Sequence, residues 1–234
     1  MHFTKKWFRR PLYKKLLPLR KNINDSEKIL TFKKQKWQRF RHQILKYNKK
    51  KFYDSMSYVL FNFNNFFSKK FKYNLQNKQR LSFFYGRLSK SYLKKLVGVT
   101  LKNSKNTKTH MTKYFLECLE TRLDSALYRA HFCSSFNSAR QLISHKKVYV
   151  NNKIVQHPTY ILKKGDLITL DKSVHNFIVS NTLKSKVWPI YPKHFQVNYR
   201  TLQILMIEDI KYSSHLINYP FWIDFNSFLQ SYKK

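Results

Sequence analysis

Hydrophobic residues recur at helical spacing in the segment that follows residue 77. The apolar members of this series stand three or four residues apart, with basic residues between them: Leu81, Phe84, Leu88, Tyr92 and Leu96. Such spacing forms one stripe along a helix, so the pattern predicts two amphipathic helices that meet near Gly86. A further helix is expected between Phe32 and Tyr47, with Phe40 on its apolar side.

The segment from residue 115 to residue 171 has the clearest pattern of the chain. An apolar stripe predicts a single helix that ends near Ala130, and Glu117, Glu120 and Asp124 share another face of it. The helix dipole favours negative charge near a helix start, so we expect these acids on the protein surface.

A second helix is expected directly after Ser135, whose hydroxyl can cap its first turn. Ala139, Leu142 and Ile143 then point inward. The opposite face is left with polar side chains that can donate hydrogen bonds: Asn137, Arg140, Gln141 and Ser144.

Short alternating runs after this helix predict a small antiparallel sheet. Residues 148–150 alternate, and Asn151-Asn152 suits a two-residue hairpin turn because asparagine tolerates positive φ. A further strand is expected over residues 166–170, entered through Lys164-Gly165. Residues 195–207 alternate well enough for one strand and part of another.

The predicted fold class is α+β, with a mostly helical N-terminal part, a small module of two helices followed by an antiparallel sheet, and a C-terminal strand extension. The expected division of the chain is a basic N-terminal arm over residues 1–53, a Phe/Asn-rich insertion or loop over 54–77, a helical segment and linker over 78–110, the module over 111–171, and a linker, strands and aromatic tail over 172–234.

Charge narrows the choice of partner. The 234 residues include 47 Lys plus Arg and 11 Asp plus Glu, so the formal net charge is +36. Self-repulsion of this size destabilises a compact state unless a polyanion neutralises it, and RNA or DNA fits best. A membrane surface is the other polyanion to consider, but no run of 18 apolar residues exists, so neither a membrane span nor a membrane partner is predicted.

The chain offers little for catalysis or metal binding. Cys118 and Cys133 are single and lack CxxC or Cys/His spacing, and the nine histidines are scattered. We therefore predict no metal, no cofactor and no catalytic residues.

Residues 122 to 170 contain an ordered set of short motifs: Arg122-Leu123-Asp124, Tyr128, Ala139 to His145, Val148 to Asn151 and Gly165-Asp166. In this order and spacing they closely resemble the RNA-binding module of small-subunit ribosomal protein S four. Two flanking segments extend the resemblance over roughly the last two-thirds of the chain: Lys78 to Tyr92, and Phe195 to Thr201, which resembles the C-terminal strand of mitochondrial members.

The sequence departs from that family's pattern at two places in the module. Asn151-Asn152 stands where the family commonly has Asn-Gly, and Ser138 stands where a Glu would complete a capping box. Residues 1–76 resemble the family only in being basic, so the path of the arm is left open.

The resemblance implies a structural constituent of the small ribosomal subunit. Such a protein binds small-subunit rRNA directly, stabilises assembly, and stands near the channel where mRNA enters, beside the neighbouring protein S five. It is not an enzyme and not a homo-oligomer, and mRNA is a further candidate partner. We expect it in the mitochondrion, with the plastid as the alternative, since the Lys- and Asn-rich, Gly-poor composition suggests an A+T-rich organellar genome.

One alternative stays open. Several pseudouridine synthases carry the same module, and Arg122-Leu123-Asp124 also resembles their catalytic aspartate loop. The chain is therefore a ribosomal protein or a stand-alone RNA-binding or RNA-modifying factor. The 18 basic residues among the first 53 favour the ribosomal protein, which keeps phosphate against them.

The candidate RNA-binding residues form two groups. Those in and beside the module are Arg80, Arg87, Arg122, Arg129, Asn137, Arg140, Gln141, Ser144, His145, Lys146, Lys147, Asn151, Asn152 and Lys153, and those in the arm are Lys33, Lys34, Lys36, Arg39 and Arg41. Within the first group, the face made by Arg140, Gln141, His145, Lys146, Lys147 and Lys153 is expected to give the specific contact with a folded RNA shape, and the arm is expected to give general affinity. Trp37 is a candidate for stacking on a base, whereas Tyr85 and Tyr92 are expected to pack.

Overall fold

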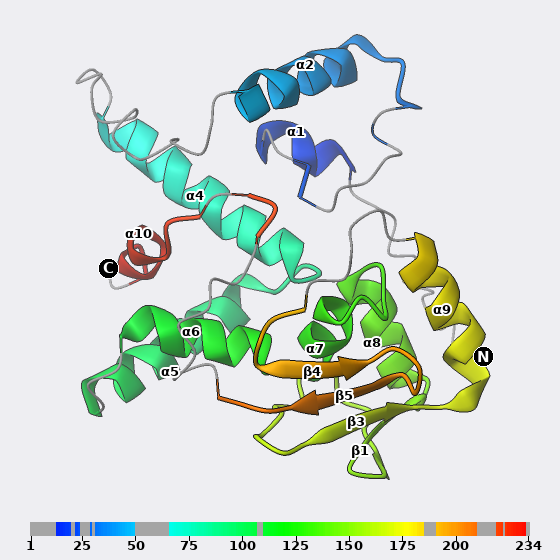
Figure 1. The fold of residues 1–234 in the computed structure, drawn as a ribbon. Coiled ribbons are helices and arrows are strands. Elements are labelled where there is room, and N and C mark those ends of the chain that lie inside the picture. Colours follow the sequence, from blue (N-terminus) through cyan, green and yellow to red (C-terminus); the bar gives the residue numbers. More distant parts are fainter. Residues whose placement is uncertain are drawn as a thin grey trace, which may run out of the picture. The chain divides into compact units, whose positions relative to one another are not determined.

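The computed structural model describes residues 13–19, 22–23, 29, 31–49, 66–106, 110–184, 191–209, 219–221 and 223–232 (Figure 1). Contacts divide the chain into two compact units, Met1–Arg80 with Tyr219–Ile223 and Leu81–Asn218 with Asp224–Lys234. Residues 1–12 and 54–65 of the expected arm and insertion lie outside the described residues.

The first unit packs short helices around apolar side chains. It contains the 3-10 turn η1 (Tyr13–Lys15), α1 (Leu16–Leu19), α2 (Gln35–Lys49) and the part of α4 (Phe66–Phe84) that ends at Arg80. Trp37 is 5% exposed, and its ring meets the ring of Phe40 edge-on with centroids 5.8 Å apart. Trp37 therefore belongs to a small core, and the predicted helix near residues 32–47 is confirmed as α2.

Helix α4 differs from the loop expected before residue 78. Residues 66–77 are helical, and Gln76 Nε2 and Arg80 Nη2 donate to the main-chain oxygens of Pro18 and Leu19, both at 3.0 Å. Asn77 lies in the buried stripe four residues before Leu81. A polar residue in that stripe interrupts the apolar period, which is why the sequence pattern did not predict this part of the helix.

The second unit begins with the helical pair predicted around Gly86. α4 ends at Phe84, and α5 (Lys90–Asn106) begins after the turn at Gly86. Residues 102–106, expected as part of a linker, continue α5. The chain divides between Arg80 and Leu81, upstream of the boundary expected near residue 110.

The single helix expected over residues 116–130 is two helices. α6 (Met111–Glu120) ends before Arg122, which is extended (φ −71°, ψ 143°), and α7 (Leu123–Arg129) follows. Arg122 forms an isolated antiparallel bridge with Ile161, and the N–H of Leu123 donates to the main-chain oxygen of Tyr160 at 2.9 Å. A contact with residues almost forty positions away thus breaks a helix that local periodicity would continue.

Five antiparallel strands follow in the order β2-β1-β3-β5-β4. The strands are β1 (Val148–Val150), β2 (Lys153–Ile154), β3 (Leu167–Leu170), β4 (Phe195–Asn198) and β5 (Gln203–Met206). One row of paired residues crosses four of them and is buried throughout: Val150, Ile168, Ile204 and Val197. The predicted α+β architecture, with helices before a small antiparallel sheet and a C-terminal strand extension, is confirmed.

Helices cover one face of this sheet. α7 and α8 (Phe136–Ser144) lie behind the strands in Figure 1, and their Leu127, Ala139 and Ile143 join the same core as Val150 and Ile168. No helix of the described residues stands in front of the opposite face in this view. That face is therefore open along β3, β5 and β4.

Two further helices occupy segments expected to be irregular. The 3-10 turn η3 (Lys172–Val174) and α9 (His175–Lys184) fall within the expected linker over residues 172–190. α10 (Phe225–Gln230) lies in the aromatic tail, and the ring of its Phe228 lies 5.2 Å from that of Phe115 in α6. The tail thus packs on the helical part of the second unit.

Two of the three acids predicted on the surface, Glu120 and Asp124, are buried, and Glu117 is half-buried. Glu120 and Asp124 are both 0% exposed. Asp124 accepts from Arg122 at 2.9 and 2.8 Å and from Arg140 Nε at 2.8 Å. The surface prediction was wrong because acids were assigned to solvent by residue type, whereas burial is tolerated once a carboxylate is paired and hydrogen-bonded.

Arg140 ties this buried group to the turn before α5. Its Nη1 donates to the main-chain oxygen of Gly86 at 2.6 Å, and its Nη2 donates to that of Tyr85 at 2.5 Å. Gly86 has φ +65°, and a Cβ added there would stand 2.8 Å from Arg140 Nη1 and 3.0 Å from Phe136 Cβ. Only glycine fits this turn without displacing its neighbours.

Gly86→Ala is expected to lower the free energy of unfolding by about 1–3 kcal/mol, since alanine is strained at positive φ and its methyl meets Arg140. Gly98→Ala is the matched control, because Gly98 is inside α5 with no atom within 4 Å of an added Cβ. That substitution should raise the stability by about 0.5–1 kcal/mol. Urea unfolding measures both, and equal effects of the two substitutions would contradict the packing described for Gly86.

Candidate nucleic-acid interface

Helix α8 is fixed at both ends by local hydrogen bonds. The Oγ of Ser135 accepts from the N–H of Ser138 at 3.2 Å, which confirms the predicted cap. At the other end the N–H of Lys146 donates to the oxygen of Ile143 and the N–H of Lys147 donates to that of Leu142, at 3.0 and 3.1 Å. This pair of bonds is a Schellman motif, with Lys146 at the left-handed position (φ 61°) that glycine usually occupies.

The end of α8 and the hairpin after it present a run of exposed polar side chains. Gln141, Ser144, His145 and Lys146 are exposed, and so are Asn152 and Lys153 at the β1–β2 turn. β1, which separates the two parts of this run, has only three residues and spans about 10 Å. We call Gln141, Ser144, His145, Lys146, Asn152 and Lys153 the hairpin surface.

The β1–β2 turn is locked to the loop before β3. Asn151 and Asn152 have φ 49° and 64°, as a type I′ turn requires, so the predicted turn is confirmed. The Nδ2 of Asn151 donates to Asp166 Oδ1 at 2.9 Å, and its Oδ1 accepts from the N–H of Leu167 at 3.0 Å. Asn151, Asn152 and Lys153 are all exposed, and the Asn151 side chain is engaged by these two bonds within the protein.

The turn held by Asp166 carries two exposed lysines that the sequence analysis did not include among the candidate residues. The Oδ2 of Asp166 accepts from the N–H of Lys163 at 2.8 Å, which holds the 163–166 turn beside the hairpin. Lys163 and Lys164 are both exposed. Their signal was the short Lys-Lys-Gly-Asp run, which was used only to predict the start of a strand.

Lys147 is only half-exposed and has an acidic partner. Its Nζ lies 2.7 Å from Asp171 Oδ2 and 2.9 Å from Ser173 Oγ. The hydrogen bond from Lys147 lowers the pKa of Asp171 to about 2, so this carboxylate is ionised throughout the physiological range. Lys147 was predicted to contact RNA, but part of its charge is neutralised within the protein by Asp171.

Three predicted RNA-binding arginines point into the fold. The expected outward orientation of Arg140 is wrong, since its guanidinium donates to Asp124, Gly86 and Tyr85. Arg140 stands four residues after Phe136 and three before Ile143, both buried, so it lies on the inward stripe of α8.

Arg122 and Arg129 are paired in the same way. Arg122 is 3% exposed and contacts Asp124 as well as the hydroxyl of Tyr92. Burial opposes the charge of Arg122, yet the hydrogen bonds to Asp124 raise its pKa. Arg129 donates to both oxygens of Glu120 at 2.9 and 2.7 Å. RNA contact by Arg122, Arg129 and Arg140 stays a prediction, with these donors engaged within the protein.

Glu120 is ionised despite complete burial. Burial alone would raise its pKa, but the charge and hydrogen bonds of Arg129, the Tyr85 hydroxyl at 2.5 Å and the charge of His194 hold the pKa below its ordinary value. The Glu120 carboxylate thus links α6, α7 and the turn before α5.

The remaining predicted residues fall into two sets. Lys33, Lys34, Lys36 and Arg39 are exposed at the start of α2 in the first unit. Arg41, Arg80, Arg87 and Asn137 are half-buried. The structure therefore brings together the hairpin surface in one unit and a lysine-rich helix start in the other.

Other chemistry is sparse in the described part of the chain. Burial raises the pKa of the Cys133 thiol to about 12, so it stays protonated. Across the described ranges, no three His, Cys, Asp or Glu side chains gather as a metal site needs. Within those same ranges, no helix is both long and apolar enough to span a membrane.

Comparison with known proteins agrees with the module. The S4 domain matches residues 121–168. The small ribosomal subunit protein uS4m of Marchantia polymorpha is 35% identical over 158 residues, which are 66% of this chain and 75% of that protein. The chain belongs to the uS4 family of small ribosomal subunit proteins. The uS4 protein of Aquifex aeolicus is 32% identical over 158 residues, 65% of this chain and 73% of its own length.

Membership of the uS4 family confirms the resemblance seen in residues 122–170. The chain is thus a ribosomal protein of the small subunit and not an enzyme. A chloroplast-type relative, uS4c of Dioscorea elephantipes, is 35% identical over 135 residues, 56% of this chain and 65% of that protein. The mitochondrial and chloroplast relatives agree with the expected mitochondrion and its plastid alternative.

Arg140→Ala is expected to lower the free energy of unfolding by about 3–5 kcal/mol, the range for breaking a buried ion pair. Gln141→Ala, one residue away on the exposed face, should change it by less than about 0.5 kcal/mol. Thermal unfolding of the two variants tests this contrast. An Arg140→Ala protein as stable as the parent would show that the guanidinium is not structural.

Proposed function

We propose that this uS4 family member binds small-subunit rRNA directly through the hairpin surface. The observation that supports this most strongly is the fixed geometry of that surface. A Schellman motif orients Lys146, and Asn151, locked to Asp166, orients Asn152 and Lys153. The main chain that carries these side chains is therefore ordered before RNA binds, and binding does not have to order it.

The contact recognises the shape of a folded RNA and not its sequence. The hairpin surface combines lysine charges with short neutral donors such as Ser144 and Asn152, which suit phosphate and ribose hydroxyl groups. Lys163 and Lys164 extend the cationic rim beside it.

The start of α2 supplies general affinity. Lys33, Lys34, Lys36 and Arg39 are exposed there, and a net charge of +36 releases many counterions from RNA. A protein with this charge stabilises a folded RNA by neutralising phosphates that would repel each other, which is the role we assign to it in subunit assembly.

The wider setting follows the family resemblance. We assign the chain to the mitochondrial ribosome, beside protein S five and near the channel where mRNA enters. The alternative of a stand-alone RNA-modifying factor is not supported, because the relatives bear ribosomal names.

The tagged full chain is expected to sediment with small-subunit rRNA in an extract of the organelle. Washing at rising salt should release it over a narrow range of salt concentration, since the affinity falls steeply with salt when many phosphates are neutralised. Sedimentation apart from small-subunit rRNA at low salt would contradict the ribosomal assignment.

Two matched double variants separate specific from general binding. Lys146→Asn with Lys153→Gln removes two charges from the hairpin surface, and asparagine still tolerates the positive φ of residue 146. Lys33→Gln with Lys34→Gln removes two charges from the start of α2. Each pair should reduce the salt slope of log K by about 0.7–0.9 for every phosphate that is no longer neutralised.

The two double variants should differ in whether their loss of affinity depends on which RNA is bound. The hairpin pair should weaken binding to the cognate rRNA by about 1.5–3 kcal/mol for each hydrogen bond to phosphate that it removes, and should affect an unrelated RNA of equal length less. The α2 pair should weaken both RNAs by about the same factor. Equal weakening of both RNAs by the hairpin pair would show that this surface does not give specificity.

A further inference from the structure

The loop that joins β2 to β3, residues 155–166, exposes two large apolar side chains. Tyr160 is 39% exposed and Ile161 is 61% exposed. Within the part of the chain that the structure describes, the ring of Tyr160 meets no other aromatic ring and its hydroxyl makes no hydrogen bond. Apolar surface left in water in this way is available to a partner.

The main chain beneath these side chains is fixed. The N–H of Leu123 donates to the main-chain oxygen of Tyr160 at 2.9 Å, and the N–H of Leu162 donates to that of Thr121 at 2.8 Å. The side chain of Leu162 lies in the core, 2% exposed. The loop is thus joined to the start of α7 on both sides of Ile161, so the fold holds Tyr160 and Ile161 at the surface.

The same loop leads to the hairpin surface. Asp166 accepts from the N–H of Lys163 and from Asn151 in the β1–β2 turn, at 2.8 and 2.9 Å. Along this chain of contacts, the exposed Lys163 and Lys164 stand between that turn and Tyr160. Three residues of extended chain span at most about 11 Å, so a strand of RNA that meets Lys163 passes within reach of Tyr160.

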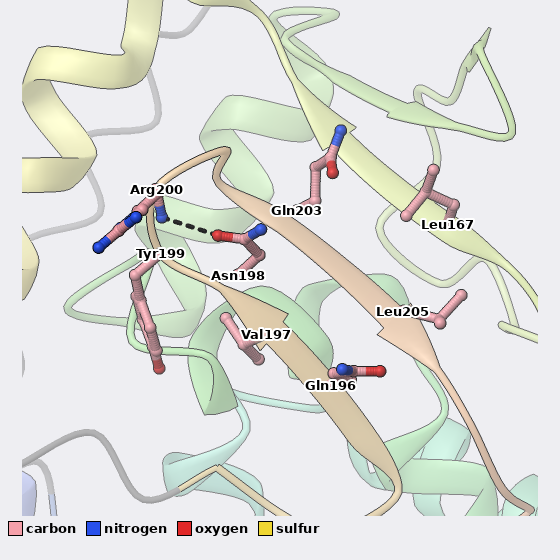
Figure 2. Close-up of a pocket in the computed structure, with 8 residues that line it drawn as sticks. All are labelled: Leu167, Gln196, Val197, Asn198, Tyr199, Arg200, Gln203 and Leu205. Atoms are coloured by element: carbon pink, nitrogen blue, oxygen red, sulfur yellow. Dashed lines mark hydrogen bonds between the residues drawn. The ribbon is translucent and has the colours of Figure 1, made fainter.

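The charge around this apolar surface differs from that of the open face of the sheet. On the open face, Leu167 and Leu205 lie among carboxamide side chains, and Arg200 is the one charged residue among those that line the hollow there (Figure 2). At the loop, two lysines stand within four positions of Tyr160. Phosphate groups are attracted to the loop, and a second cationic protein would be repelled by it.

An unpaired nucleotide matches the groups of the loop. Its phosphate is neutralised by lysine, and its base offers a flat face that stacks on a tyrosine ring. A base inside a duplex is covered on both faces by its neighbours, so only a base at a bulge, loop or junction has a face to offer. Ile161 adds apolar area beside the ring that such a nucleotide can cover.

We propose that Tyr160 and Ile161 form a stacking site for an unpaired nucleotide of the small-subunit rRNA, with Lys163 and Lys164 on its flanking phosphates. The inference rests on the rRNA binding proposed above and adds a requirement to it: the RNA presents an extruded base beside the backbone that meets the hairpin surface. Because every base has a π face, the site selects an unpaired position and not a particular base.

Two substitutions at Tyr160 separate stacking from bulk. Tyr160→Phe keeps the ring, and Tyr160→Leu keeps an apolar side chain without the ring. The affinity of the full chain for the organelle's small-subunit rRNA is measured at several salt concentrations. Tyr160→Leu should weaken binding about 5- to 150-fold, the range for loss of one base–aromatic stack, and Tyr160→Phe should bind nearly as tightly as the parent.

The salt dependence distinguishes this site from the charged ones. Tyr160→Leu removes no charge, so the slope of log K against log salt should stay unchanged, whereas Lys146→Asn with Lys153→Gln should reduce it. Equal affinities of the parent and Tyr160→Leu, or equal losses by the two Tyr160 variants, would overturn the stacking site. Failure of the parent to bind the rRNA would instead overturn the proposed function.

Photo-crosslinking in assembled small subunits gives a second measurement that does not depend on how the leucine variant folds. Benzoylphenylalanine replaces Tyr160 in the full chain and keeps an aromatic ring there. It is expected to crosslink to an rRNA nucleotide that primer extension locates at an unpaired position. A crosslink to a protein, a crosslink to paired nucleotides alone, or no crosslink in intact subunits would also overturn the stacking site.

Discussion

Two buried carboxylates hold the RNA-binding module together. Asp124 accepts from Arg122 and Arg140, and Glu120 accepts from Arg129, with both acids fully buried. Burying an ion costs several kcal/mol, so these ion pairs add little to the net stability of the protein. Their main effect is to fix the relative positions of the elements that carry them. Through Arg140 the Asp124 carboxylate is connected to the main chain of the turn before α5, so this turn is held against α7 and α8.

This arrangement separates the two kinds of basic residue by task. The three arginines face carboxylates, where a planar guanidinium donates two bonds in fixed geometry. The exposed cations of the hairpin surface are lysines, each a point charge on a flexible stem that does not demand one binding geometry. In a chain of net charge +36, the few acids thus select which cations are structural.

Local chemistry in the sequence predicted the features that depend on neighbours alone. The Ser135 cap, the Asn151-Asn152 turn and the strand pair in residues 195–207 are all confirmed. The break between α6 and α7 could not be read this way, because Arg122 is extended by pairing with Ile161. The orientation of Arg140 failed for a related reason, since only the fold brings Asp124 to it.

The order of strands in the sheet determines when each strand pair can form as the chain is synthesised. β1, β2 and β3 are close in the chain and can pair as soon as residue 170 has emerged, which completes the hairpin surface. The edge of β3 then waits for β5, more than thirty residues later, and β4 joins through β5. Contacts that are near in sequence form fastest. The hairpin surface of a nascent chain is therefore complete while the far half of its sheet is still being made.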